Sequence, residues 1–431
     1  MEIHIPYTTF TLPNGLRVFV HEDTSVPLVS VNLWYHVGSK DERPGRTGFA
    51  HLFEHLMFEG SAHAPAGEFD NLLESAGGVN NGSTSPDRTN YWETLPSDAL
   101  ALAFWLESDR MGWLAMSQET LDTQRDVVIN ERRQSYENRP YGMAYETVLA
   151  ALYPPEHPYN WPVIGHVKDL ESATLEDVRA FFTTYYAPNN ATLAVAGHTT
   201  ATAVEELAHR YFGEIPAGPP VPPVAAPPAP IEADRRLVLE DRVRLPRLYL
   251  AWHSPPQFAP GDAALETAAA ILADGKASRL YRSLVYERQV AQDVDAFQDG
   301  GLLGSTFEVA VTARPGVGLE ELEAAVREEL RRIAREGVEA AELDRARNRI
   351  ETAFVDALQH AGGFGGKADR MNEYFFYTGD PGYADADLRR FLELTPDAVQ
   401  AAVAEHLADS GRVILSVVPK GRPELAAGGA A

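Results

Sequence analysis

Alternating hydrophobic and polar residues open the chain and predict a β-hairpin. Residues 7–12 and 16–21 alternate as strands do, and Asn14-Gly15 between them favours a two-residue type I′ turn. A third strand is expected over 28–37, where the alternation continues in part. The start of the chain therefore predicts neighbouring antiparallel strands.

Helical and strand-like periods then follow one another through the first half of the chain. Glycines mark the ends of the first two helices, and Ser117 is placed to cap a later one. The expected helices are 47–58, 68–75, 98–116, 118–137 and 175–185, and the expected strands are 79–85, 89–95 and 191–196. Strands paired through hairpins beside separate helices are typical of the α+β class.

The second half resembles a weak copy of the first. Strands at 236–240 and 247–252 precede a helical stretch at 263–273, which occupies the place of the helix at 47–58. The ends match best: Thr174 and Thr395 each stand before a helix that a buried strand follows, at 191–196 and 412–417. The sequence predicts an α+β fold of two homologous domains, each a largely antiparallel β-sheet with helices packed on one face.

A proline-rich stretch separates the halves. Eight prolines fall among the fifteen residues of 216–230, a composition that excludes helix and central strand. We therefore expect an N-terminal catalytic domain over 1–215, a linker over 216–234, a C-terminal domain over 235–420 and a disordered tail over 421–431.

Composition narrows the partners and the chemistry. The chain has 431 residues and a formal net charge of −25, which argues against nucleic acid or an anionic membrane as the main partner. It has no cysteine, so a metal would have to use histidine and carboxylate ligands. With no signal peptide or membrane-spanning run visible, we expect a cytoplasmic protein, and a periplasmic location stays open.

The string FAHLFEHLM carries the chemistry. His51 and His55 are four residues apart, which places both imidazoles on one face of a helix, where they can bind one metal ion. Glu54 lies nearby and is offset enough to act on a water molecule instead of the metal. The alternative is an amphipathic helix with surface histidines, but this helix is mostly apolar, and buried His and Glu are costly unless paired or metal-bound.

A catalytic zinc site needs a third protein ligand. Glu131 is a candidate because it follows Val127 and Val128 by four and three residues, which places it beside the apolar face of its helix. A solvent-facing Glu131 is the competing interpretation at this point.

Nearly the whole chain resembles the pitrilysin–insulinase family of inverzincin zinc metallopeptidases, in its processing-peptidase-like branch of two-domain subunits. The motifs that carry the resemblance are LPNGLRVFV, GFAHLFEHLMFEGS, RTNYW, RDVVINE, HPYNWPVIG, YYAPNNATLAVAG and TPDAVQ with VILSVVP. In that family a Glu about this far along the chain is the third zinc ligand, and Glu131 stands 76 residues after His55. The resemblance thus implies zinc held by His51, His55 and Glu131, with Glu54 as the general base.

The resemblance also implies an activity and a place for the substrate. The chain is expected to be a zinc metalloendopeptidase that hydrolyses small or unfolded peptides through zinc-activated water. The alternative is a non-catalytic structural or assembly subunit of the same family. In the family a substrate strand adds to the sheet edge after the His-bearing helix, which corresponds to 80–84, and Asn81 and Thr84 are the expected substrate-binding residues.

Two departures from the family pattern bear on the site. A second Glu often stands seven residues before the metal Glu, and here that position is Gln124, which can donate a hydrogen bond but carries no charge. Active relatives also offer an Arg and a Tyr seven residues apart in the C-terminal domain, where this chain has Val285 and Gln292. We therefore expect a heterodimer with a related subunit that supplies the Arg and the Tyr. A homodimer that uses Tyr286 or Arg288 is the alternative.

Overall fold

The computed structural model describes residues 3–428, which form two compact units of three chain segments each. The first unit contains the residues up to Arg132, Trp161–Ala225 and Ala353–Ala386, and the second contains Arg133–Asn160, Ala226–Thr352 and the residues from Asp387 onward. The sequence predicted domains that follow chain order, whereas each unit here includes a segment from the other half of the chain.

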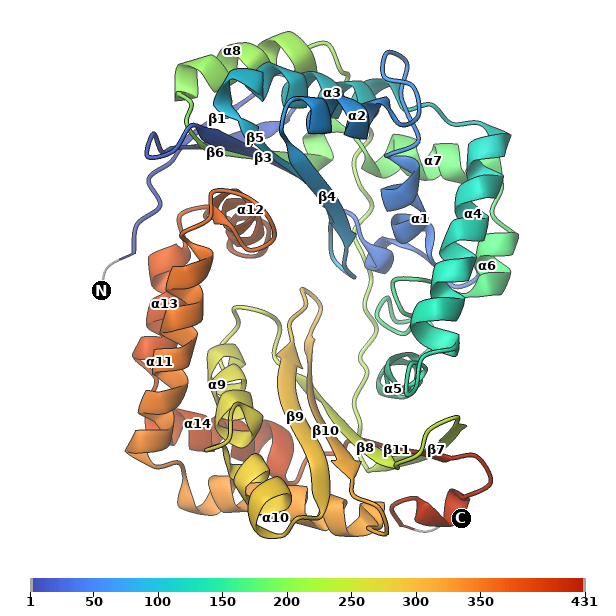
Figure 1. The fold of residues 1–431 in the computed structure, drawn as a ribbon, viewed down its shortest axis with the longest axis vertical. Helices are drawn as coiled ribbons and strands as arrows, with labels where there is room; N and C mark the ends of the chain where they lie inside the picture. The colour runs from blue at the N-terminus through green and yellow to red at the C-terminus, as the bar shows by residue number, and fades with distance from the viewer. Residues whose placement is uncertain (1–2, 429–431) are drawn as a thin grey trace. The chain divides into compact units, whose positions relative to one another are not determined.

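The first unit is built on a six-stranded sheet of order β1-β2-β6-β3-β5-β4 (Figure 1). Only β2 and β6 run parallel, so the sheet is largely antiparallel, as predicted. The strands are β1 Thr8–Thr11, β2 Arg17–Glu22, β3 Leu28–Tyr35, β4 Val79–Thr84, β5 Thr89–Pro96 and β6 Ala191–Gly197. Strand β4 lies at the edge and pairs with β5 alone in this sheet.

The first hairpin differs from its prediction in the turn. Leu12 and Leu16 pair through the Leu12 amide, which leaves a three-residue loop from Pro13 to Gly15 in place of the two-residue turn. A type I′ turn needs positive φ at both central residues. Here Gly15 alone is positive, at 94°, because Pro13 takes part in the loop and its ring fixes a negative φ.

Most helices of the first unit lie close to their predicted ranges. The predicted ones are α1 Phe49–Leu56, α2 Glu68–Ser75, α3 Leu100–Trp113, α4 Gln118–Arg132 and α7 Leu175–Tyr185. Three further helices were not predicted: α6 Val167–Glu171, α8 Ala201–Phe212 and α12 Lys367–Thr378. Ser117 caps α4 as expected, because its Oγ accepts a hydrogen bond from the Thr120 amide at 3.1 Å.

One helix of the first unit comes from late in the chain. Helix α12 packs against β2, β3 and β6, where Phe19 of the sheet contacts Phe375. At its start the Asp369 carboxylate accepts hydrogen bonds from the side chains of Asn32, Trp34 and Asn90 at 2.9–3.2 Å. The first sheet is therefore covered by helices on both faces, since α12 lies on one face and α3 and α8 lie on the other (Figure 1).

The second unit repeats this topology. Its five-stranded sheet has the order β7-β11-β8-β10-β9, in which only β7 and β11 run parallel. Strand for strand, β7, β11, β8, β10 and β9 correspond to β2, β6, β3, β5 and β4. The strands are β7 Arg235–Asp241, β8 Arg247–Ser254, β9 Ala291–Asp299, β10 Ser305–Ala313 and β11 Val413–Pro419.

The helices of the second unit build a core on each face of its sheet. Helices α9, α10 and α14 contribute to one apolar cluster, which includes Trp252 and Phe307, and α5 contributes to a smaller one on the other face. Their bounds are α5 Ala144–Leu152, α9 Asp262–Ala273, α10 Leu319–Glu336 and α14 Pro396–Val403, while α11 Ala340–Ala357 and α13 Ala384–Leu392 have residues in both units.

The structure agrees with the predicted linker but differs from the predicted disordered tail. Residues 217–232 contain no helix or strand, as the prolines require. Disorder was expected over 421–428, but Ala426 and Ala427 are buried in the second core and the Ala427 amide donates to Ser416. The other residues of the predicted tail, 429–431, lie outside the described residues.

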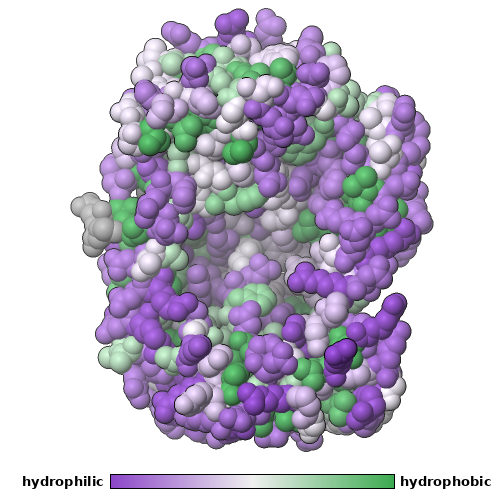
Figure 2. Space-filling model, viewed as in Figure 1, coloured by the Kyte–Doolittle hydropathy of each residue, from purple (hydrophilic) through white to green (hydrophobic). Residues whose placement is uncertain are grey.

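The surface is mainly polar. On the face that Figure 2 shows, hydrophilic residues predominate and apolar residues are scattered among them. Among the described helices, none has both the length and the apolar character needed to cross a membrane.

Candidate metal centre

Helix α1 is buried on one side and carries its polar residues on the other. Gly48 precedes it with a φ of 87°, which glycine adopts without strain, and a Cβ there would lie 2.9 Å from the Ile164 carbonyl. Phe49, Ala50, Leu52, Phe53 and Leu56 are buried. The helix packs against α4, α7 and β4, and Phe49 and Phe53 of its apolar side contact Phe181 of α7.

Glu42 holds the start of this helix. Its carboxylate accepts hydrogen bonds from the amides of Gly48 and Ala50 at 2.9 and 2.8 Å and from Trp161 Nε1 at 3.0 Å. Gly48 has no side chain that could cap the helix, so Glu42 supplies acceptors for the free amides. Burial raises the pKa of Glu42 to about 8.

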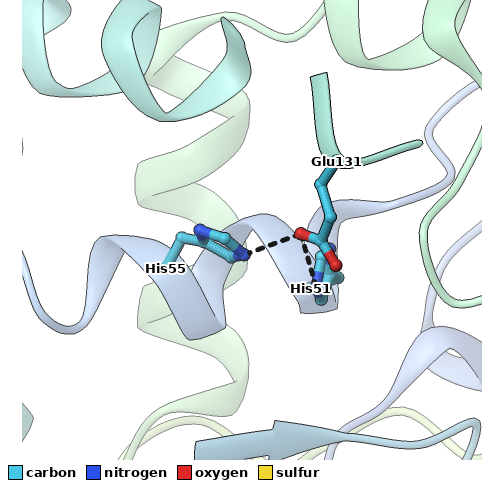
Figure 3. A group of neighbouring side chains, drawn as sticks. All are labelled: His51, His55 and Glu131. Carbon is cyan, nitrogen blue, oxygen red and sulfur yellow. Dashed lines mark ion pairs between the residues drawn. The ribbon is translucent and has the colours of Figure 1, made fainter. Parts of the chain in front are cut away.

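The two histidines of α1 meet Glu131 of α4 (Figure 3). Glu131 Oε2 lies 3.4 Å from His55 Nε2 and 3.7 Å from His51 Nε2. One ligand atom from each residue falls within 4.8 Å of both others. Glu131 is thus turned toward the histidines and not toward solvent alone, the alternative that the sequence left open.

The donor set fits a zinc ion. In a tetrahedral site with bonds of about 2.0–2.1 Å, neighbouring ligand atoms lie about 3.4 Å apart, close to the observed separations. Burial lowers the pKa of His51 to about 4, which favours the neutral imidazole that binds metals. Hydrogen bonding from His55 lowers the pKa of Glu131 and keeps it ionised.

Glu54 is oriented by a residue of β4. Thr84 Oγ1 donates a hydrogen bond of 2.6 Å to Glu54 Oε2. Burial raises the pKa of Glu54, while this hydrogen bond acts in the opposite direction. A carboxylate with a raised pKa that is fixed in one orientation suits proton transfer.

The predicted substrate edge lies beside this carboxylate. A Cβ added to Gly82 of β4 would lie 3.4 Å from Glu54 Cγ, so the strand and the Glu54 side chain approach closely. Asn81 Oδ1 accepts a hydrogen bond of 2.8 Å from the Gly82 amide. Substrate binding by Asn81 and Thr84 stays a prediction, and Thr84 has a further contact, to Glu54, that the sequence did not indicate.

The structure shows the contacts of the three residues that depart from the family pattern, which are Gln124, Val285 and Gln292. Gln124 Nε2 donates to Glu59 Oε1 at 2.6 Å. Glu131 raises the pKa of His55 against the effect of burial, and Gln124 adds to that rise. In the second unit, Val285 packs against the apolar core and Gln292 is exposed on β9. Neither of these two residues offers a charged donor.

Sequence reasoning missed Glu42, Glu59 and the orienting contact of Thr84. A helix that begins after glycine lacks a side-chain cap, which is a signal that an acceptor must come from elsewhere. The sequence does not indicate which carboxylate fills that role, because Glu42, Asp41 and Glu59 are all acidic residues near α1 in the chain.

Comparison with known proteins places this site in a family. A profile described as "Insulinase (Peptidase family M16)" matches residues 17–160, and one described as "Peptidase M16 inactive domain" matches 172–350. The two-sheet fold, the paired histidines and these matches agree. The chain belongs to peptidase family M16.

Individual relatives match this chain over 80% or more of its length. "Zinc protease PqqE" of Helicobacter pylori is 29% identical over 96% of this chain and 93% of its own length. A probable mitochondrial-processing peptidase subunit beta of Arabidopsis thaliana is 24% identical over 80% of this chain and 66% of its own. The crystal structure of a protease from Helicobacter pylori superposes with a TM-score of 0.91 at 27% identity, covering 97% of this chain and all of that one.

Proposed function

We propose that this chain is a zinc-dependent metalloendopeptidase that hydrolyses peptide bonds in small or unfolded peptides. The observation that carries the proposal is the convergence of His51, His55 and Glu131 from two helices, with Glu54 held beside them by Thr84. The names of relatives as zinc proteases support the same metal.

Each residue has a role in this proposal. His51, His55 and Glu131 would hold a zinc ion, which supplies a Lewis acid for the scissile carbonyl. Glu54 takes a proton from the attacking water and passes it to the leaving amine, help that is typically worth about 10²–10⁴-fold. The backbone of β4 pairs with an extended substrate, and Asn81 and Thr84 contact its side chains.

Zinc content and peptide cleavage test the proposal together. The purified chain should contain one zinc ion and cleave an unstructured peptide, as followed by mass spectrometry. A chelator should remove both zinc and activity, and added zinc should restore them. A chain without zinc would contradict the metal assignment.

A non-catalytic subunit of the same family is the second candidate. It is favoured because this chain has Val285 and Gln292 at the positions where active relatives carry an Arg and a Tyr. One zinc per chain without cleavage, alone or with a partner, would support this second candidate over the first.

We further propose that the active form is a heterodimer. A related subunit would supply the missing Arg and Tyr, and loss of one donor that stabilises an oxyanion typically costs about 10²–10³ in rate. A homodimer with Tyr286 or Arg288 is the alternative, although Arg288 already forms an ion pair with Glu328 at 3.3 Å. Full activity of the chain alone, unchanged on dilution to monomer, would exclude both kinds of dimer.

A further inference from the structure

The edge strand β4 turns alternate residues to the two faces of the first sheet. Thr84 donates a hydrogen bond to Glu54, and Gly82 approaches the same side chain, so these two positions face α1. Because side chains alternate along a strand, Val79 and Asn81 face the other way. A peptide strand that pairs with β4 would likewise direct alternate side chains to the face of α1 and to the face of Val79 and Asn81.

The second of these faces carries exposed apolar side chains beside the edge. Val79 is 59% exposed. The register with β5 sets Thr94 opposite Val79 and Trp92 opposite Asn81. Phe364 is 52% exposed, and its ring meets the Trp92 ring edge to face with the centroids 5.6 Å apart. All of these residues belong to the first unit.

The loop that carries Phe364 lies directly on this face of the sheet. A Cβ added to Gly362 would lie 2.1 Å from Ser30 Oγ and 2.3 Å from Thr94 Oγ1, so a larger residue would displace the loop. Since Thr94 is the cross-strand neighbour of Val79, the loop reaches the strand next to the edge. Phe364 is therefore presented beside β4.

The start of α12 anchors the other end of the loop (Figure 1). The Gly365 amide donates a hydrogen bond of 2.8 Å to Asp369, the carboxylate that also accepts hydrogen bonds from three side chains of the sheet. Phe364 thus lies between two fixed glycines, Gly362 and Gly365. An aromatic ring on an anchored loop loses less conformational entropy on binding than a ring on a free loop.

We propose that Val79, Trp92 and Phe364 form a subsite for an apolar side chain, aromatic or large aliphatic, of the peptide that pairs with β4. A side chain on this face would lie next to Val79 and beside the Phe364 loop, and it would cover apolar surface that is now exposed. The inference rests on the proposed function, because it needs a peptide strand on β4. It adds the class of residue that the substrate carries near the cleaved bond.

Binding of matched peptides tests the subsite. The probes are unstructured peptides of one sequence that carry Phe, Ser or Lys at a single position. Fluorescence anisotropy measures their affinity for the full chain with Glu54→Gln, which should not cleave them. The Phe peptide should bind at least about tenfold more tightly than the Ser peptide, because burial removes the aromatic side chain from water. With the wild type, the cleaved bond should move along the peptide when the Phe is moved.

Substitutions of Phe364 assign the preference to this patch. Phe364→Ala should remove most of the preference, and Phe364→Leu, which stays apolar, should keep part of it. Phe297→Ala is the matched control, because it removes a ring that is 41% exposed on β9 of the second unit, and it should leave the preference intact. Phe364 is half exposed, so its variants should melt like the wild type.

The outcomes separate this inference from the proposed hydrolysis. Equal binding of the Phe and Ser peptides, tighter binding of the Lys peptide through cation–π contacts, or a preference that persists in Phe364→Ala would each overturn the inference. A preference for Phe without cleavage by the wild type would support the inference and contradict the proposed hydrolysis. Cleavage without any preference would do the reverse.

Discussion

Helices α1 and α9 occupy the same place in two copies of one topology, yet only α1 carries candidate metal ligands. Each follows a glycine with a left-handed φ, 87° at Gly48 and 91° at Gly261. Counting from these glycines, the positions of His51, Glu54 and His55 are taken in α9 by the residues Ala264, Thr267 and Ala268.

The difference shows how one scaffold serves two purposes. Ala264, Thr267 and Ala268 are all buried, so α9 uses small side chains to pack into the second core. Helix α1 buries its apolar side and leaves both imidazole rings partly accessible beside Glu131. The fold supplies the position of the helix, and three side chains decide whether the position is a core or a site.

The largest effect is expected from a substitution of Glu54, whose position in α9 is taken by a threonine. Glu54→Gln keeps the shape and can still accept a hydrogen bond from Thr84, but it cannot take a proton. We expect kcat to fall by at least about 10²-fold while zinc content stays at the wild-type value. Peptide cleavage and metal analysis on the same sample check this, and retention of a tenth of the wild-type kcat would contradict the role of Glu54 as base.

The next effect concerns the residue that reaches α1 from α4. Glu131→Ala removes one of the three proposed ligands and should weaken zinc binding by more than about 100-fold, since even residues that only support ligands cost about 10–100-fold. Gln124→Ala, on the same helix, is the control and should change zinc affinity far less. Competition with a chelator of known affinity measures both, and wild-type affinity in Glu131→Ala would assign the third ligand elsewhere.

A smaller effect is expected from substitutions of Thr84, which the sequence predicts to be a substrate-binding residue. Thr84→Val removes the hydrogen bond to Glu54 and should lower kcat by about 10- to 100-fold, the range for a bond to a charged group. Thr84→Ser keeps the hydroxyl and should retain most of the rate. A change confined to KM, with kcat intact, would assign Thr84 to substrate binding alone.

The smallest effect is on stability. Glu42→Ala leaves the amides of Gly48 and Ala50 without acceptors and should lower the free energy of unfolding by about 1–3 kcal/mol. Glu42→Gln keeps an acceptor oxygen and should lose less. Denaturant unfolding followed by tryptophan fluorescence checks the pair, because Trp161 contacts Glu42 directly. Equal stability of all three proteins would mean that water replaces the carboxylate at no cost.

Much of the fold could be predicted because periodic patterns are local. The strands at 79–84 and 89–96 and the helix at 68–75 agree with the alternation and the glycines that border them. Strands β9 and β10 were not predicted, and neither was the exchange of segments between units. The exchange of segments depends on contacts between residues far apart in sequence, which no local period reports. Strands β9 and β10 form a local hairpin, but the exposed positions of β9 are mainly charged, so β9 lacks a clear apolar alternation.

The candidate site likewise could be predicted from the sequence only where its geometry is local. The spacing of His51 and His55 fixed their shared face through helix geometry alone. Glu131 required the family resemblance, because its distance in sequence carries no information about its distance in space. The contact of Thr84 with Glu54 joins a strand to a helix, and it is visible only once both elements are placed.

The late helix α12 has a consequence for how the protein is made. During synthesis the N-terminal sheet emerges early, but Asn32, Trp34 and Asn90 find their shared acceptor, Asp369, only after most of the chain has left the ribosome. Until then one face of that sheet lacks its cover, which is the condition under which nascent chains associate wrongly or recruit chaperones. A fragment that ends at the proline-rich linker would remain in this state permanently.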